Sequence, residues 1–170
     1  SYTGGIIYNK TPEGKKGVIN THPNHQLIYS KSKSKGIKDI KLNCNNLKRV
    51  YLYTNMFTDY TIFNMLKKNF KELELLYIGF NRFIKNVEKL EEIIFEKMKK
   101  IGLTYVFNED NYKNIGKFNL KNLEELYIQS NGISNLDIFE KMNLPNVKEI
   151  YLINNELEEV DRSEEHTSEL

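Results

Sequence analysis

The residues of this sequence that could bind a metal ion are two histidines and the single cysteine. His22 and His25 flank a Pro-Asn pair, and Cys44 follows further along the chain. Zinc sites use three or four protein ligands held close together, so these three candidates form an incomplete set. Two histidines beside a turn are better explained as surface-loop residues. We therefore expect no metal site and no bound cofactor.

Catalytic side chains also form no recognisable grouping. Residues 11–17 (TPEGKKG) contain glycines and lysines, but they lack the spacing of a phosphate-binding loop and its Ser or Thr after the lysine. The glutamates lie on segments whose polar pattern predicts a solvated face, and no Ser/His/Asp or Cys/His arrangement can be argued from the spacing. We therefore expect that the protein is not an enzyme.

Tyrosine is the residue type whose spacing suggests a function, namely binding to another macromolecule. Five tyrosines, four of which lie between two apolar residues, recur at intervals of 26, 28, 22 and 24 residues: Tyr51, Tyr77, Tyr105, Tyr127 and Tyr151. A tyrosine ring offers a large contact area with a polar hydroxyl at its tip, which favours it at interfaces.

Each of these tyrosines lies inside a copy of one pattern, L-x-x-L-x-L-x-x-N. The copies begin at Leu47, Leu73, Ile101, Leu123 and Val147. The clearest ends at Asn131, whereas the copy from Ile101 has Glu109 in place of the asparagine. A period of roughly 20–30 residues indicates repeats that each pack on the next.

The pattern predicts different tasks for its positions. The apolar positions face the interior, and the asparagine amide can bond to backbone groups of the adjoining repeat that would otherwise be buried unpaired. Because Glu109 interrupts this series, we expect the third repeat to be the weakest.

The segments NLEELYIQSN, LPNVKEIYLINN, LKRVYLYTN and LELLYIGFN resemble the leucine-rich repeat superfamily, and NGISNLDIF resembles its short internalin-like and phosphatase-regulator-like repeats. The resemblance covers residues 47–161. It implies an α/β solenoid with parallel strands on the concave face and helices and irregular segments on the convex face. It also implies recognition of a protein partner through the concave face, although the fold alone does not name the partner.

Side chains between the inward positions are predicted to point outward onto this face, because side chains alternate along a strand. This register also places Leu75, Leu103 and Gly79 outward. The expected partner-binding residues are Arg49, Tyr51, Tyr53, Tyr77, Phe80, Tyr105, Phe107, Glu125, Tyr127, Gln129, Glu149, Tyr151 and Ile153. An alternative explanation of the tyrosine column is structural, because tyrosine favours strands and ring contacts between neighbours stabilise a sheet.

The segments between strands differ in length and in expected structure. After Asn55, a helix capped by Thr58 or Asp59 is predicted to bury Phe63, Leu66 and Phe70. A long helix is expected over residues 87–101, supported by pairs of Glu92 or Glu96 with Lys97 or Lys100. Residues 110–119 are expected to be irregular. A short helix is expected at residues 137–142, with Ile133, Leu136 and Phe139 facing inward.

The chain divides into three expected parts: an N-terminal flank or cap at residues 1–36, the truncated repeat array at 37–161, and a non-native tail at 162–170. Residues 1–36 are compatible with a hairpin from 6–8 to 18–19, or with decayed repeats in which Ile28-Tyr29 aligns with Val50-Tyr51. Residues 37–46 form the return segment into the first clear repeat. The tail, RSEEHTSEL, resembles a translated sequencing adapter and is excluded from fold reasoning.

Charge and composition leave two further functions open. Residues 1–50 contain ten basic and two acidic side chains, whereas residues 51–170 contain fifteen and twenty-one. The basic third could bind nucleic acid while the tyrosines stack on bases, but the acidic remainder argues against that. The chain could also be the regulatory or targeting arm of a larger enzyme. One cysteine permits no internal disulfide, which favours a reducing compartment such as the cytoplasm, or a bacterial surface. No apolar run reaches the length of a membrane span.

Overall fold

The structure is a computed structural model that describes residues 48–52, 57–82 and 84–158 in full, together with the backbone of residues 6–10, 16–22 and 26–29. Tyr53, Cys44, the return segment at 37–46 and the tail at 162–170 lie outside the described residues.

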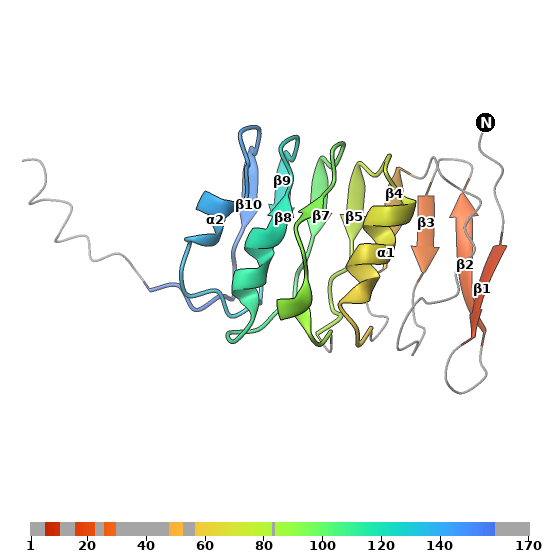
Figure 1. Ribbon diagram of the computed structural model, residues 1–170, viewed down its shortest axis with the longest axis horizontal. Helices are drawn as coiled ribbons and strands as arrows, with labels where there is room; N and C mark the ends of the chain where they lie inside the picture. The colour runs from red at the N-terminus through yellow and green to blue at the C-terminus, as the bar shows by residue number, and fades with distance from the viewer. Residues whose placement is uncertain are drawn as a thin grey trace, which may run out of the picture.

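In the described part of the chain, eight short strands form one sheet whose spatial order follows the sequence (Figure 1). Neighbours from β3 onward are parallel. Because parallel neighbours need a crossover connection, each repeat supplies one strand and one return segment. The strands are β1 (Ile6–Lys10), β2 (Lys16–His22), β3 (Gln26–Tyr29), β4 (Arg49–Tyr51), β5 (Leu75–Tyr77), β7 (Lys100–Gly102), β9 (Glu125–Tyr127) and β10 (Glu149–Tyr151).

The N-terminal strands combine the two arrangements that the sequence allows. β1 and β2 form the expected antiparallel hairpin, with Tyr8 opposite Val18. β3 then pairs in parallel with β4, as a repeat strand does, but Ile28 lies opposite Tyr51. The predicted alignment of Ile28 with Val50 is therefore wrong by one residue.

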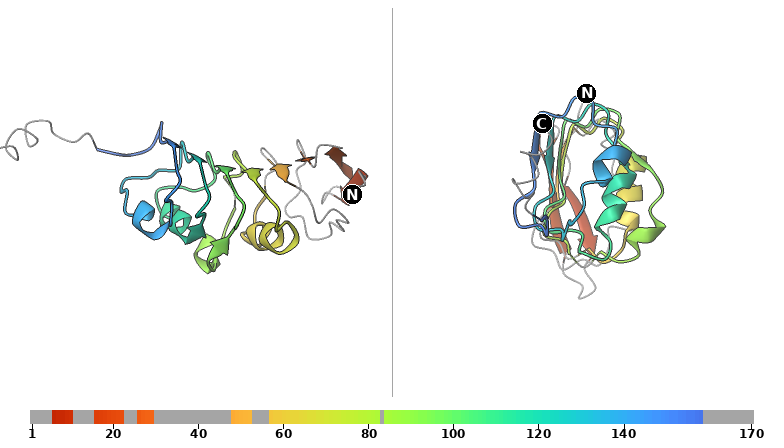
Figure 2. Two further views of the ribbon diagram at one scale, coloured as in Figure 1. Left: turned by 90° about the horizontal axis from the view of Figure 1, so that it is seen from above. Right: turned by 90° about the vertical axis from the view of Figure 1, so that its left-hand side faces the viewer.

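The return segments form a second layer on one side of the sheet (Figure 2). Its first helix, α1 (Thr61–Asn69), is confirmed, with Phe63, Leu66 and the following Phe70 buried. Asp59 supports the first turn, because its Oδ1 accepts a hydrogen bond from the Thr61 backbone N–H at 2.9 Å. This bond occupies one of the donors that a helix N-terminus leaves unpaired.

The long helix predicted over residues 87–101 is wrong. The chain instead forms one 3₁₀ turn, η1 (Val87–Lys89), and a two-residue strand, β6 (Ile93–Ile94), which pairs in parallel with β8 (Phe118–Asn119) of the next repeat. Ile94, which the helix would bury, is 43% exposed. Stacking of successive repeats thus overrides the helical preference of the local sequence. The buried residues here are Val87, Leu90, Ile93, Phe95 and Met98.

The glutamates and lysines of this segment pair between repeats rather than along a helix. Lys97 contacts Glu72 at 2.5 Å, and Lys121 contacts Glu96 at 2.7 Å. These side chains are exposed, so each pair stabilises the fold by at most about 1 kcal/mol.

Two later connections also differ from expectation. Residues 110–119 are not irregular, because they contain the 3₁₀ helix η2 (Tyr112–Lys117), which buries Tyr112 and Ile115. The last helix, α2 (Ile138–Lys141), is shorter than predicted. Ile138 takes the buried position, so Leu136 is 45% exposed rather than inward.

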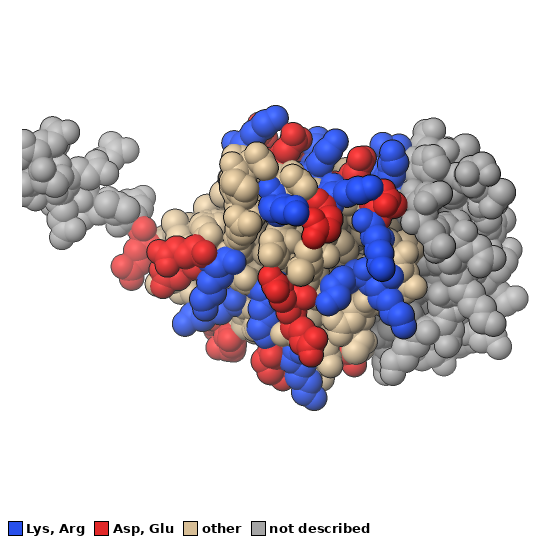
Figure 3. Space-filling model, turned by 45° about the horizontal axis from the view of Figure 1, so that its top comes forward, with Lys and Arg blue, Asp and Glu red and all other residues tan. Residues whose placement is uncertain are grey.

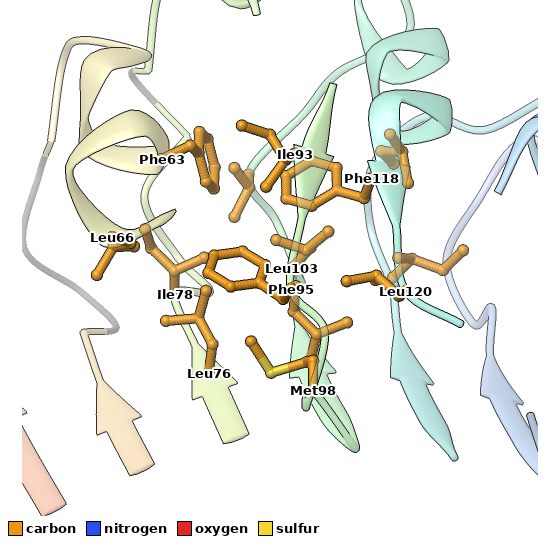
Figure 4. Packing of buried hydrophobic residues seen from close by; sticks show 14 of the residues in the cluster. Phe63, Leu66, Leu76, Ile78, Ile93, Phe95, Met98, Leu103, Phe118 and Leu120 are labelled. Atoms are coloured by element: carbon orange, nitrogen blue, oxygen red, sulfur yellow. The ribbon is translucent and has the colours of Figure 1, made fainter. Parts of the chain in front are cut away.

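The core lies between the sheet and the return segments (Figure 4). Leu76 and Ile78 come from the β5 region, and they meet Phe95 and Met98 of the return segment that follows. Phe63 of α1 contacts Phe118 edge to face at a centroid distance of 5.4 Å. Each such side chain, when fully buried, stabilises the fold by about 1.5–3 kcal/mol.

The third repeat begins three residues earlier than the sequence pattern suggested. Ile101 lies opposite Leu76 and Leu126, so it occupies the second apolar position and Met98 occupies the first. The middle positions of the repeats then recur at steps of 26, 25, 25 and 24 residues from Val50. The left-handed backbone position confirms this register, because it recurs at Phe80, Tyr105, Ser130 and Asn154.

The corrected register moves the asparagine position from Glu109 to Val106. Asn131 shows what this position does, since its Nδ2 donates to the Leu103 carbonyl at 3.0 Å while its Oδ1 accepts from the Val106 and Phe107 N–H groups at 3.0 and 2.8 Å. Asn81 and Asn155 serve their preceding repeats in the same way. Glu109 is exposed and does not interrupt the series, whereas Val106 replaces the amide with a buried apolar side chain.

Candidate functional site: the outer face of the sheet

The candidate site is the side of the sheet that points away from the core, which we call the outer face. Strand pairing aligns its side chains in rows across the repeats. The first row contains Arg49, Leu75, Lys100, Glu125 and Glu149, and the second contains Tyr51, Tyr77, Gly102, Tyr127 and Tyr151.

The four tyrosines of the second row form one continuous series of ring contacts, which we call the tyrosine ladder. Tyr51 and Tyr77 have a centroid distance of 5.6 Å, and Tyr127 stacks on Tyr151 at 4.5 Å with an interplanar angle of 3°. Tyr77 and Tyr127 also meet, edge to face at 5.8 Å. Such aromatic pairs contribute roughly 0.5–1.5 kcal/mol each beyond the area that they bury.

Gly102 makes the central contact of the ladder possible. Tyr77 and Tyr127 come from strands that are not neighbours, since β7 lies between them. The Tyr77 ring covers the place where a side chain of β7 would stand, and a Cβ on Gly102 would lie 2.3 Å from Tyr77 Cδ1. A residue with any side chain at position 102 would therefore separate the two rings.

Acidic side chains hold the hydroxyl groups at the C-terminal end of the ladder. The Tyr127 hydroxyl donates to Glu125 Oε2 at 2.9 Å, and the Tyr151 hydroxyl donates to Glu149 Oε2. Lys100 lies 3.3 Å from Glu125 Oε2 and partly neutralises that carboxylate. Each strand thus fixes the orientation of its own tyrosine through a glutamate two residues earlier.

These surroundings favour the neutral form of the tyrosines. Burial raises the pKa of Tyr77 above its ordinary value of 10.0, and it raises the pKa of Tyr127 further, with help from the hydrogen bond to Glu125. The hydrogen bond to Glu149 is the main cause of the raised pKa of Tyr151. Near neutral pH all three hydroxyls are therefore protonated.

A second aromatic group lies on the loop side of the ladder. Phe80 and Tyr105 contact edge to face at 5.9 Å, and the Arg82 guanidinium lies 5.3 Å from the Tyr105 ring centroid. Phe80 is 57% exposed. Further along, Ile153 is the most exposed of the large apolar residues in the described part of the chain, at 69%.

The structure brings together most of the residues that the sequence placed on this face, with corrections in the third repeat. Leu103 and Phe107 are 0% and 3% exposed, so they belong to the core rather than to the outer face. Tyr105 belongs to the loop-side row with Phe80, not to the tyrosine row. Tyr53 lies outside the described residues.

The same corrections identify outer-face residues that the sequence reasoning missed. They are Lys100, Gly102 and Thr104, and Thr104 donates its hydroxyl proton to Gln129 Oε1 at 2.7 Å. The signal was present in the spacing of Met98, Ile101 and Leu103, which matches the apolar pattern better than the spacing from Ile101 does. The predicted register is wrong here because it places Tyr105 in the same row as the tyrosines of the other repeats.

Residues 121–164 match the family model described as "Leucine Rich repeats (2 copies)". This match covers the two repeats that begin at Leu123 and Val147, and it includes residues 162–164 of the tail. It supports leucine-rich repeats in this chain, and such repeats generally mediate protein–protein interaction. No curated protein and no solved structure matches the chain. Among the described residues, no helix has the length and apolar character needed to cross a membrane.

Proposed function

We propose that this protein is a non-enzymatic scaffold that binds a protein partner through the outer face, which would be the concave face of a leucine-rich repeat solenoid. The observation that carries the proposal is the tyrosine ladder. Four rings from four strands form a continuous aromatic surface, and they do so on the side of the sheet that none of the described return segments covers.

The backbone conformation at Phe80 and Tyr105 supports this proposal. Both residues adopt a left-handed conformation, with φ of 59° and 56°. An L-residue with a bulky side chain is disfavoured there by roughly 1–2 kcal/mol, whereas asparagine tolerates the conformation. Asn154 occupies the same position in a later repeat. Two aromatic side chains at these positions reduce stability, which is consistent with a role in binding.

The apolar residues of the face support a protein partner rather than nucleic acid. Phe80 and Ile153 expose large apolar side chains, which protein interfaces commonly bury. Glu125 and Glu149 lie beside the ladder and would repel a phosphate backbone. The same row also contains Arg49 and Lys100, so its charges balance and it offers no excess of positive charge to a phosphate backbone.

Replacing two ladder tyrosines tests the proposal. The full chain is used as immobilised bait, and its bound proteins are compared quantitatively with those of the Tyr77→Ala/Tyr127→Ala variant. We expect a specific partner to bind the wild-type chain and to be lost from the variant, while circular dichroism shows that the variant keeps its fold.

A variant with two exposed lysines of the helix side replaced, Lys113→Gln/Lys141→Gln, is the control and should retain the partner. If the tyrosine variant instead unfolds, the ladder is structural and the proposal loses its main support. If it stays folded and keeps every partner, the outer face is not the binding surface.

A further inference from the structure

A second candidate site lies on the opposite side of the molecule from the tyrosine ladder. A hollow of about 710 Å³ opens between the C-terminal half of α1 and residues 89–96. Lysines stand on both of its walls. Lys67, Lys68 and Lys71 come from α1 and the residues after it, and Lys89 comes from η1. Figure 3 shows basic side chains gathered over this region of α1.

The hollow carries an excess of positive charge. Within the described residues, Lys68, Lys71 and Lys89 are exposed and form no salt bridge. Among the described residues, Lys67 donates only to the Glu92 backbone carbonyl, at 3.2 Å, and forms no salt bridge. The lining contains two carboxylates, but Glu96 is already paired with Lys121 at 2.7 Å.

An apolar side chain lies beside these lysines. Ile94 is 43% exposed in the lining, and its neighbour Phe95 is 3% exposed beneath the surface. Ile94 is the β6 residue that the failed helix prediction placed in the core, and the strand conformation turns it outward instead. A ligand that fits this hollow therefore offers an apolar group as well as negative charge.

The chemistry of the lining favours an acidic peptide over nucleic acid. Glu91, the lining carboxylate that forms no salt bridge within the described residues, would repel a continuous phosphate backbone, whereas an extended peptide can place its carboxylates opposite the lysines and leave a gap at Glu91. An extended peptide also points alternate side chains to opposite sides, so it can present an apolar residue to Ile94.

We propose that this hollow binds an acidic peptide segment that carries an apolar side chain. The lysines on the two walls attract its carboxylates, and Ile94 contacts the apolar side chain. This site is separate from the outer face, and the proposal for it does not depend on the function proposed for that face.

A peptide titration tests the proposal. A short fluorescent peptide of alternating Glu and Leu is titrated against the full chain at low ionic strength, with binding followed by anisotropy. The variant Lys71→Gln/Lys89→Gln removes one exposed charge from each wall, and Lys113→Gln/Lys141→Gln removes the same charge elsewhere on the helix side. We expect binding to the first variant to be weaker by about three- to tenfold, and binding to the second to be unchanged.

Further probes distinguish binding that depends on the peptide's carboxylates from non-specific hydrophobic binding. A Gln/Leu peptide of the same length should bind much more weakly than the Glu/Leu peptide. The proposal is overturned if the Glu/Leu peptide does not bind, if both lysine variants weaken it equally, or if the Gln/Leu peptide binds as well. It is also overturned if a single-stranded oligonucleotide binds more tightly than the peptide and loses its binding in Lys71→Gln/Lys89→Gln.

Discussion

Gly102 shows how a missing side chain can organise a surface. The tyrosine row would be interrupted in the third repeat, but the space above Gly102 lets the Tyr77 ring reach Tyr127 across β7. The ladder is therefore continuous because one position in the row, Gly102, has no side chain. The sequence pattern could not show this, because it reports which residues point outward but not which rings meet.

The Gly102→Ala variant tests the role of that space. Its Cβ would lie 2.3 Å from Tyr77 Cδ1 and must displace the ring. We expect the free energy of unfolding to fall by about 0.5–1.5 kcal/mol, the value of one aromatic contact. Gly116→Ala is the matched control, because the nearest atoms to its Cβ would be those of the Lys141 side chain at 3.4 Å and the Ile138 carbonyl oxygen at 3.8 Å, which are ordinary contact distances. Urea unfolding that shows equal losses for both variants would contradict the account of Gly102.

The hydroxyl groups of the ladder predict a dependence of stability on alkaline pH. The pKa values of Tyr77, Tyr127 and Tyr151 are raised in the folded chain, whereas an unfolded tyrosine ionises near 10.0. The folded state therefore binds protons that the unfolded state releases, and stability falls as the pH rises above 10. Urea unfolding between pH 8 and 11 should show this fall. Tyr127→Phe should lessen it, and an identical pH profile would contradict the assignment.

At the scale of elements, the sequence predicted strands better than return segments. The strands of the eight-stranded sheet from β4 onward lie within an apolar pattern that recurs in every repeat, and the pattern was informative even where the register was three residues wrong. The segment at 87–101 failed because its local composition favours a helix, while its structure depends on β6 pairing with β8 in the next repeat. A contact between residues so far apart leaves no periodic signal in either segment.

Proline substitutions distinguish the two kinds of return segment. Leu90 has φ of −58° and ψ of 129°, an extended conformation that favours a proline after it. We expect Glu91→Pro to cost less than about 1 kcal/mol, because no helix is interrupted, and Asn64→Pro inside α1 to cost about 3 kcal/mol or more. Thermal unfolding measures both. A loss of helical circular dichroism in Glu91→Pro would indicate that the wild-type chain is helical around residue 91, which would contradict the structure.

At the scale of the whole molecule, the two sides of the sheet have different chemistry. The outer face is aromatic, with exposed apolar residues and glutamates that fix the tyrosine hydroxyls. The helix side carries the lysine-lined hollow. The sequence predicted the outer face from alternation along the strands. It could not predict the hollow, because that site depends on how α1 lies beside residues 89–96.

The affinity of the isolated partner for two variants, which alter opposite sides of the molecule, tests the proposed binding surface most directly. Ile153→Asp changes an outer-face residue that is 69% exposed, and Leu136→Asp changes a residue beside α2 that is 45% exposed. Neither side chain supports the core, so both variants should unfold at the wild-type temperature. We predict that calorimetry shows Ile153→Asp weakening the partner by about tenfold or more, while Leu136→Asp binds as the wild type does. Equal affinity of the two variants, or a loss confined to Leu136→Asp, would contradict a binding surface on the outer face.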